Sequence, residues 1–203
     1  RIESRGLGDV YKRQTQGYSF SKNFFSDMGA YAARNGDPNY FSMILFAMSL
    51  TIVGITFISY YLLLPRLLGS DRINYILAWI GTLFAIGGSV CMIGTGFTPS
   101  DVVFTPHVFF ANNIFHCFLV TALLYTIVIF RSNGLQKRYA IGYAIFFLSI
   151  FIYVMILQYG PSVNSGESAL VFQVLSQKVI VIVFCFSVIH QTFGFTKSGI
   201  FKQ

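Results

Sequence analysis

The sequence predicts an all-α protein, a polytopic bundle of transmembrane helices. Of its 203 residues, 55% are hydrophobic and only 10% are charged, whereas a soluble globular domain carries about 25% charged residues. Long stretches contain no Asp, Glu, Lys or Arg, and each can supply the roughly 20 apolar residues that cross the core of a bilayer. The 23 Phe and 12 Tyr exclude a disordered chain, and a net charge of +7 without a basic run argues against a nucleic-acid-binding protein.

Five charge-poor segments predict five spans within a transmembrane domain that covers residues 41–203. The expected helices are residues 41–64, 74–95, 107–130, 139–159 and 168–190. Prolines support the boundaries: Pro65 is expected to end the first span, Pro99 and Pro106 separate the second from the third, and Gly160-Pro161 ends the fourth.

The beginning of the chain is expected to be non-native. Residues 9–14 read DVYKRQ, which resembles a translated sequencing-adaptor artefact, so residues 1–14 are set aside as a tag would be. Residues 15–40 then form a segment that precedes the first span. We expect a first helix upstream of this segment in the intact protein, which would have six spans, so that the present sequence is a fragment.

The basic residues of the loops predict the orientation of the bundle. The loop after the first span contains Arg66 and Arg72, and the loop after the third contains Arg131, Lys137 and Arg138. The C-terminal tail adds Lys197 and Lys202. The two alternate loops, residues 96–106 and 160–167, contain no Lys or Arg. We therefore expect a cytoplasmic C-terminus, an external segment 15–40, and a place in a prokaryotic cytoplasmic (inner) membrane.

Polar residues within the spans form the first candidate site. Lys178 is expected about ten residues into the last span, near the middle of the membrane, where a lysine costs on the order of 2.5–3.5 kcal/mol. Its amine should therefore point into the bundle, with Asn113 or His116 as the expected partner. If the amine is charged, Asp27 and Asp101 are the candidate counter-ions, provided that their loop dips inward. The candidate intramembrane site comprises Lys178, Gln177, Gln173, Ser176, His116, Asn113 and Asn112. It predicts either an ion, proton or headgroup site or a structural network of hydrogen bonds.

A second candidate cluster lies on the predicted external side. It comprises Ser26, Asp27, Asp101, His107 and Glu167. Such residues can bind a cation or support hydrolysis, and the alternative is that the carboxylates cap helix N-termini in ordinary loops.

The sequence predicts no catalytic residue, no metal ligand and no cofactor. It contains no HExxH, GxSxG, P-loop or GxGxxG motif. The three cysteines, Cys91, Cys117 and Cys185, have no CxxC spacing and are expected to pack as small apolar side chains.

Three short motifs occur in an order that resembles a known membrane family. They are YSFSKNFFSDMG at residues 18–29, Pro99-Ser100-Asp101 followed by His107, and Ser176-Gln177-Lys178. This order resembles the prokaryotic domain-of-unknown-function 998 family and the related Frag/DRAM/Sfk-type membrane proteins. The resemblance covers about Tyr18 to the end of the chain. It implies a role in lipid organisation or membrane signalling and assigns no catalytic residue.

Three classes of function follow. The first is a multi-pass membrane protein, non-enzymatic, that organises lipid or signals, with the bilayer and a lipid or small molecule as its partners. The alternative is a small transporter or ion- or proton-linked protein that uses Lys178 and His116. A second alternative is an integral-membrane hydrolase with an external metal site. The oligomeric state is not predicted.

Overall fold

The computed structural model describes residues 17–132 and 136–198. It confirms the all-α fold, with five helices that are long and apolar enough to cross a membrane. They are α2 (Tyr40–Leu68), α3 (Arg72–Phe97), α4 (Phe104–Arg131), α5 (Arg138–Tyr159) and α6 (Glu167–Ser198). Two short 3₁₀ turns accompany them, η1 (Phe25–Gly29) and η2 (Val163–Ser165). The expected leader 1–14 and Lys202 lie outside the described residues.

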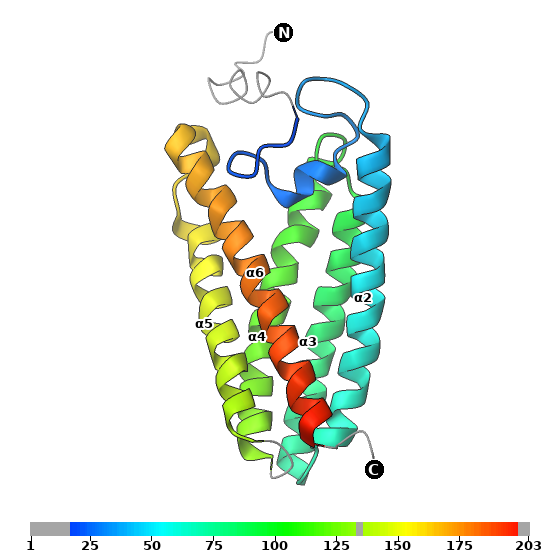
Figure 1. The fold of residues 1–203 in the computed structure, drawn as a ribbon, viewed down its shortest axis with the longest axis vertical. Coiled ribbons are helices and arrows are strands. Elements are labelled where there is room, and N and C mark those ends of the chain that lie inside the picture. Colours follow the sequence, from blue (N-terminus) through cyan, green and yellow to red (C-terminus); the bar gives the residue numbers. More distant parts are fainter. Residues whose placement is uncertain (1–16, 133–135, 199–203) are drawn as a thin grey trace.

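The five helices run lengthwise and pack against their neighbours in chain order, from α2 to α6 (Figure 1). Helices α2 and α6 are therefore the two edges of the row. Figure 1 shows α6 tilted, so that it approaches α2 at the end of the molecule where the described chain finishes. We call that end the basic end and the opposite one, where η1 lies, the cap end.

Small residues bring α3 close to its neighbours, as small residues do between membrane helices. A Cβ placed on Gly81 would meet the ring of Tyr125 at 3.0 Å, and one on Gly88 would meet the ring of Phe118 at 2.9 Å. Between these glycines Ala85 is fully buried. Helix α3 thus packs its small face against large aromatic rings of α4.

The interior towards the basic end is rich in tyrosine. The hydroxyl groups of Tyr61 and Tyr143 lie 3.4 Å apart, and those of Thr82 and Tyr125 lie 2.8 Å apart. All four side chains are buried. Their mutual hydrogen bonds satisfy polar groups that hydrocarbon cannot.

Three boundaries differ from the predictions. Helix α2 continues past Pro65 to Leu68, because the carbonyl of Tyr61, four residues before the proline, accepts a hydrogen bond of 2.9 Å from Thr82 instead. Pro106 lies in the first turn of α4, where its missing N–H costs nothing. Helix α6 runs on to Ser198 instead of ending near residue 190.

Candidate functional site

Residues 17–39, which we call the cap, fold over one end of the bundle instead of forming an open loop. The carboxylate of Asp101 accepts backbone hydrogen bonds from Tyr31 at 2.9 Å and Ala32 at 2.8 Å. Lys22 forms an ion pair of 2.6 Å with Glu167, the first residue of α6. The cap is thus fastened to the loop before α4 and to the start of α6.

Lys178 is the third and deepest attachment of the cap. Its amine donates hydrogen bonds to the hydroxyl of Tyr18 and, at 2.9 Å, to the backbone carbonyl of Asn23. The same nitrogen lies 3.7 Å from the centre of the Phe25 ring and 5.3 Å from that of Phe20, close enough for cation–π attraction. Lys178 is only 1% exposed.

The expected partners of Lys178, Asn113 and His116, were the wrong ones. Lys178 lies eleven residues from the start of α6, about 16 Å along the helix axis. The cap reaches that depth because η1 enters the end of the bundle (Figure 1). The amine therefore finds its acceptors in the cap and needs none from another membrane helix.

Asp27 supplies the negative charge of this region. Its carboxylate forms an ion pair with Arg34 and accepts hydrogen bonds from the Asn23 amide at 3.1 Å and the Phe24 backbone at 2.9 Å. Burial raises the pKa of the Tyr18 phenol, and the Asp27 carboxylate raises that pKa further. Tyr18 therefore remains neutral at physiological pH and accepts the hydrogen bond from Lys178.

The three polar neighbours of Lys178 on α6 serve different purposes. Gln177 accepts a hydrogen bond of 2.9 Å from the backbone of Phe25 in the cap. Gln173 donates instead to the carbonyl of Pro161 at 3.0 Å, which holds the turn after α5. Ser176 donates to the carbonyl of Phe172 in its own helix at 2.7 Å. Of the three, only Gln177 joins Lys178 in holding the cap.

In the described chain, the polar residues of α4 form no hydrogen bond to Lys178. Asn113 donates to the carbonyl of Phe109 at 2.7 Å, and a ring nitrogen of His116 lies 2.9 Å from the carbonyl of Asn112. Both bonds stay within one turn of α4. The predicted network between this face of α4 and Lys178 is therefore absent from the hydrogen bonds of the described residues.

Four of the five residues of the predicted external cluster belong to the cap or bind it: Ser26 and Asp27 lie in η1, Asp101 binds Tyr31 and Ala32, and Glu167 pairs with Lys22. His107 is buried, and its Nδ1 lies 2.6 Å from the carbonyl of Thr98 at the end of α3. Asp101 binds the cap backbone and does not cap a helix. Ser26 lies in η1, next to Asp27. No three His, Cys, Asp or Glu side chains in residues 17–132 and 136–198 are grouped so that they could hold a metal ion.

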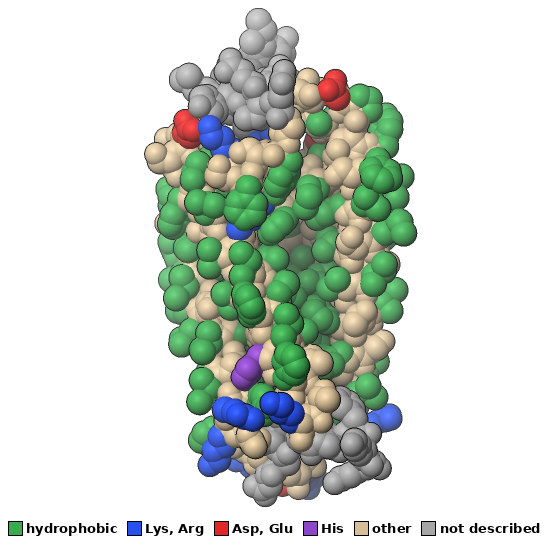
Figure 2. All heavy atoms as spheres, viewed as in Figure 1, with side chains coloured by type: hydrophobic (Ala, Val, Ile, Leu, Met, Phe, Trp, Pro, Cys, Tyr) green, Lys and Arg blue, Asp and Glu red, His purple; other side chains and the backbone are tan. Residues whose placement is uncertain are grey.

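Sequence reasoning missed a large cavity between α2 and α6, which we call the seam cavity. Its volume is about 650 Å³. The walls come from residues 46–57 of α2 and 177–189 of α6, with Phe118 and Phe146 behind and Phe25 and Met28 as the roof. Figure 2 shows the hollow between these helices, surrounded by hydrophobic side chains. Because the walls come from segments that are far apart in the chain, no local sequence pattern predicts the cavity.

Aromatic contacts close the seam on the side of the basic end. The rings of Phe57 and Phe184 have centres 5.2 Å apart, and those of Tyr60 and Phe195 lie 6.1 Å apart. The seam cavity is thus bounded by aromatic rings at one end and by the cap at the other.

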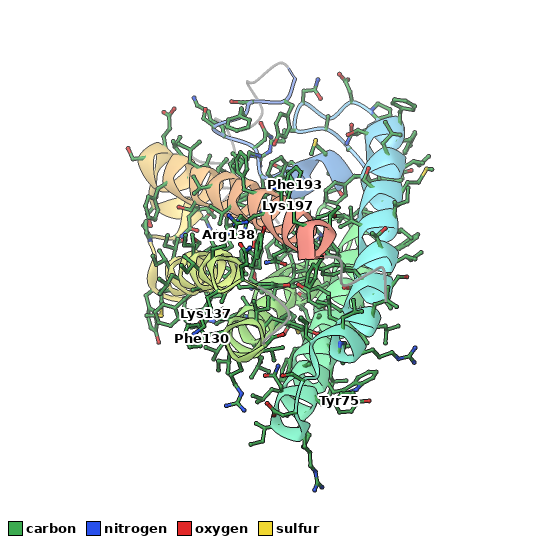
Figure 3. The ribbon with its side chains drawn as sticks, turned by 60° about the horizontal axis from the view of Figure 1, so that its bottom comes forward. Tyr75, Phe130, Lys137, Arg138, Phe193 and Lys197 are labelled. Carbon is green, nitrogen blue, oxygen red and sulfur yellow. The ribbon has the colours of Figure 1, made fainter. Side chains whose placement is uncertain are left out.

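Basic side chains gather at the end opposite the cap (Figure 2). Figure 3 brings this end forward and labels Lys137, Arg138 and Lys197 beside the aromatic residues Phe130 and Phe193. The Lys137 amine lies 4.9 Å from the centre of the Phe130 ring. All three basic side chains are exposed, as expected of residues at a membrane surface.

Five apolar helices, whose charged side chains other than Lys178 lie towards the two ends, define a multi-pass integral membrane protein. Comparison of the chain with protein-family models, with curated proteins and with solved structures found no match.

Proposed function

We propose that this membrane protein is non-enzymatic and organises lipid by holding an apolar chain in the seam cavity. The observation that carries the proposal is the cavity itself, about 650 Å³ in volume and walled by helices that are apolar enough to cross a bilayer. Pockets of 300–1,000 Å³ are typical of sites for small ligands. The role agrees with the one that the resemblance to the domain-of-unknown-function 998 family implies, and membership of that family stays a prediction.

The chemistry of the walls favours a lipid chain over water. A buried water needs two to four polar partners. The hydroxyls of Ser49, Thr56 and Thr95 line the cavity but already donate to carbonyls of their own helices, at 2.7, 2.8 and 2.8 Å. Hydrocarbon needs no such partners, and it surrounds these helices in a membrane.

The cap covers one end of the cavity and so limits the route by which a ligand can enter. Phe25 and Met28 cover its upper end, and Lys178 and Gln177 fix this part of the cap. An acyl chain therefore enters sideways, from the bilayer, and not through the roof from water. The loop charges favour a cytoplasmic basic end and an external cap in a prokaryotic inner membrane, and this orientation belongs to the proposal.

Bound lipid tests the proposal directly. The protein is purified in a mild detergent, and the lipid that remains bound is extracted and quantified by mass spectrometry. Val181→Trp places a large ring at a position that lines the cavity, and we expect it to lower the retained lipid about tenfold, because the same space cannot hold both groups.

Val179→Trp is the matched control. Val179 lies two residues away on the same helix, is 59% exposed and does not line the cavity. This variant should retain lipid as the unmodified protein does. Equal retention by the two tryptophan variants, or no retained lipid in any of the proteins, contradicts the proposal.

A further inference from the structure

The cap end of the seam cavity carries an amide and a hydroxyl group that make no bond within their own helix among the described residues. Gln177 and Ser26 both line the cavity. The Gln177 side-chain oxygen accepts the hydrogen bond from the Phe25 backbone, so its NH₂ group carries the two remaining donors. Among the described residues, neither this NH₂ group nor the Ser26 hydroxyl makes a hydrogen bond. The two groups therefore offer donors at one end of an apolar cavity.

No charged side chain among the residues that the structure describes lines the cavity. Lys178 is the nearest candidate, but its amine is turned towards the cap, where it donates to Tyr18 and Asn23. The ring of Phe25 lies against this amine and also forms part of the roof. A carboxylate or phosphate inside the cavity would have no exposed cation to pair with, and an unpaired charge is costly in hydrocarbon.

The dimensions fit a single elongated molecule. The α2 wall extends from residue 46 to residue 57, about 16 Å along the helix axis. The donors lie at the cap end of this length, Phe57 lies at its other end on α2, and on α6 the lining continues past Phe184 to Ile189. A ligand with one polar end would place that end at the roof and its chain along α2 and α6.

We propose that the seam cavity selects a neutral lipid, a long apolar chain that ends in an uncharged oxygen acceptor such as a hydroxyl or carbonyl group. The acceptor oxygen binds the Gln177 NH₂ group and the Ser26 hydroxyl at the roof. This inference rests on the proposed function and adds the chemical class of the ligand. Phospholipids and ionised fatty acids fall outside this class.

Two probes that differ only in the head group test the selection. The protein is placed in phosphatidylcholine nanodiscs with diazirine-labelled hexadecanol or diazirine-labelled palmitic acid at pH 8 and is then irradiated. Labelled peptides are quantified by mass spectrometry. We expect the alcohol to label residues 46–57 and 177–189 at least about tenfold more than the acid, since a carboxylate finds no partner in the cavity.

Two variants connect the preference with the roof. Ser26→Ala and Gln177→Leu remove the donors and should lower labelling by the alcohol about threefold to tenfold each, while Ser176→Ala, beside Gln177 but outside the cavity lining, should not change it. Thermal unfolding of each variant identifies any that does not fold, and the comparison of the two probes on the unmodified protein remains decisive in that case.

The outcomes separate this inference from the proposed function. Equal or stronger labelling of the cavity by palmitic acid overturns the neutral class but leaves the lipid site standing. Absence of cavity labelling by both probes overturns the lipid site as well.

Discussion

The seam between α2 and α6 is built in two ways along its length. Towards the basic end the two helices meet directly through large rings, Phe57 with Phe184 and Tyr60 with Phe195. Towards the cap end the tilt of α6 separates the two helices, and residues such as Ser49 and Val181 line the cavity between them. At that end the cap, and not a contact between the two helices, closes the seam cavity. The difference shows that one pair of tilted apolar helices can touch at one end and leave room for a ligand at the other.

Removal of the aromatic closure should have the largest effect on stability. The ring of Phe57 contacts those of Tyr61, Phe118 and Phe184. Phe57→Ala should cost about 3 kcal/mol and lower the Tm by roughly 6–12 °C, because it extends the cavity into the closed half. Thermal unfolding in detergent measures the change. Phe41→Ala, on the same helix and 78% exposed, should leave the Tm nearly unchanged, and equal losses would show that Phe57 does not close the seam.

The cap closes the other end of the seam cavity, and loss of the Lys178 amine should detach it from α6. Lys178→Met keeps the length of the side chain but removes two hydrogen bonds and the cation–π contacts. We expect limited proteolysis within residues 17–39 to become at least about tenfold faster, since each 1.4 kcal/mol is a factor of ten. Lys197→Met removes an exposed charge from the same helix and should leave the cap protected. A cap that stays protected in Lys178→Met would contradict its role as the anchor.

Chemical rescue sharpens this result. Lys178→Ala leaves an empty place between the aromatic rings and the acceptors of the cap. Millimolar propylammonium should restore part of the protection from proteolysis, because a small cation can take the place of the amine. Propanol, which has the same chain without the charge, should restore none. Rescue by both compounds to the same extent would mean that volume, and not charge, holds the cap.

The aromatic contact closest to the amine should contribute a smaller amount. The Phe25 ring centre lies 3.7 Å from the Lys178 amine, and a desolvated cation–π contact is worth about 1–2 kcal/mol. Phe25→Leu should therefore speed cleavage of the cap about fivefold or more. Phe20 is 58% exposed and lies at 5.3 Å, so Phe20→Leu should change cleavage less. The reverse order would argue against the cation–π contribution.

The smallest expected effect concerns the basic end and acid pH. The backbone N–H of Asn74 holds the pKa of Asp71 below its usual value, and Arg131 lowers it further. A lowered pKa stabilises the folded state above the ordinary pKa of the carboxyl, and this contribution is lost as pH falls through the folded-state value. Between pH 5 and pH 3 the Tm should fall about 2 °C more in the unmodified protein than in Asp71→Asn. The same fall in both proteins would exclude Asp71 as the source.

The sequence predicts a feature correctly where the chemistry of a residue or segment alone determines whether it is buried or exposed to lipid. Apolar runs without charge predict membrane helices whatever their neighbours are, and the cost of a charged amine in hydrocarbon predicts that Lys178 points inward. The prediction fails where the partner is distant. The contacts of Lys178 with Asn23 and Tyr18 span 155 and 160 residues, and the effect of Pro65 depends on Thr82 in the next helix. The seam cavity depends on residue sizes in several segments at once.

The contact between the cap and Lys178 also orders the biosynthesis of the protein. Synthesis runs from the N-terminus, so the cap leaves the ribosome long before residue 178 is translated. Under the proposed orientation its aromatic rings have already crossed the membrane when α6 inserts, and they receive the charged amine as it arrives. Until then, nothing from α6 holds the roof of the seam cavity. Insertion of the last helix is therefore the step that completes the lipid site, and a nascent chain that ends before Lys178 has a cap without its anchor.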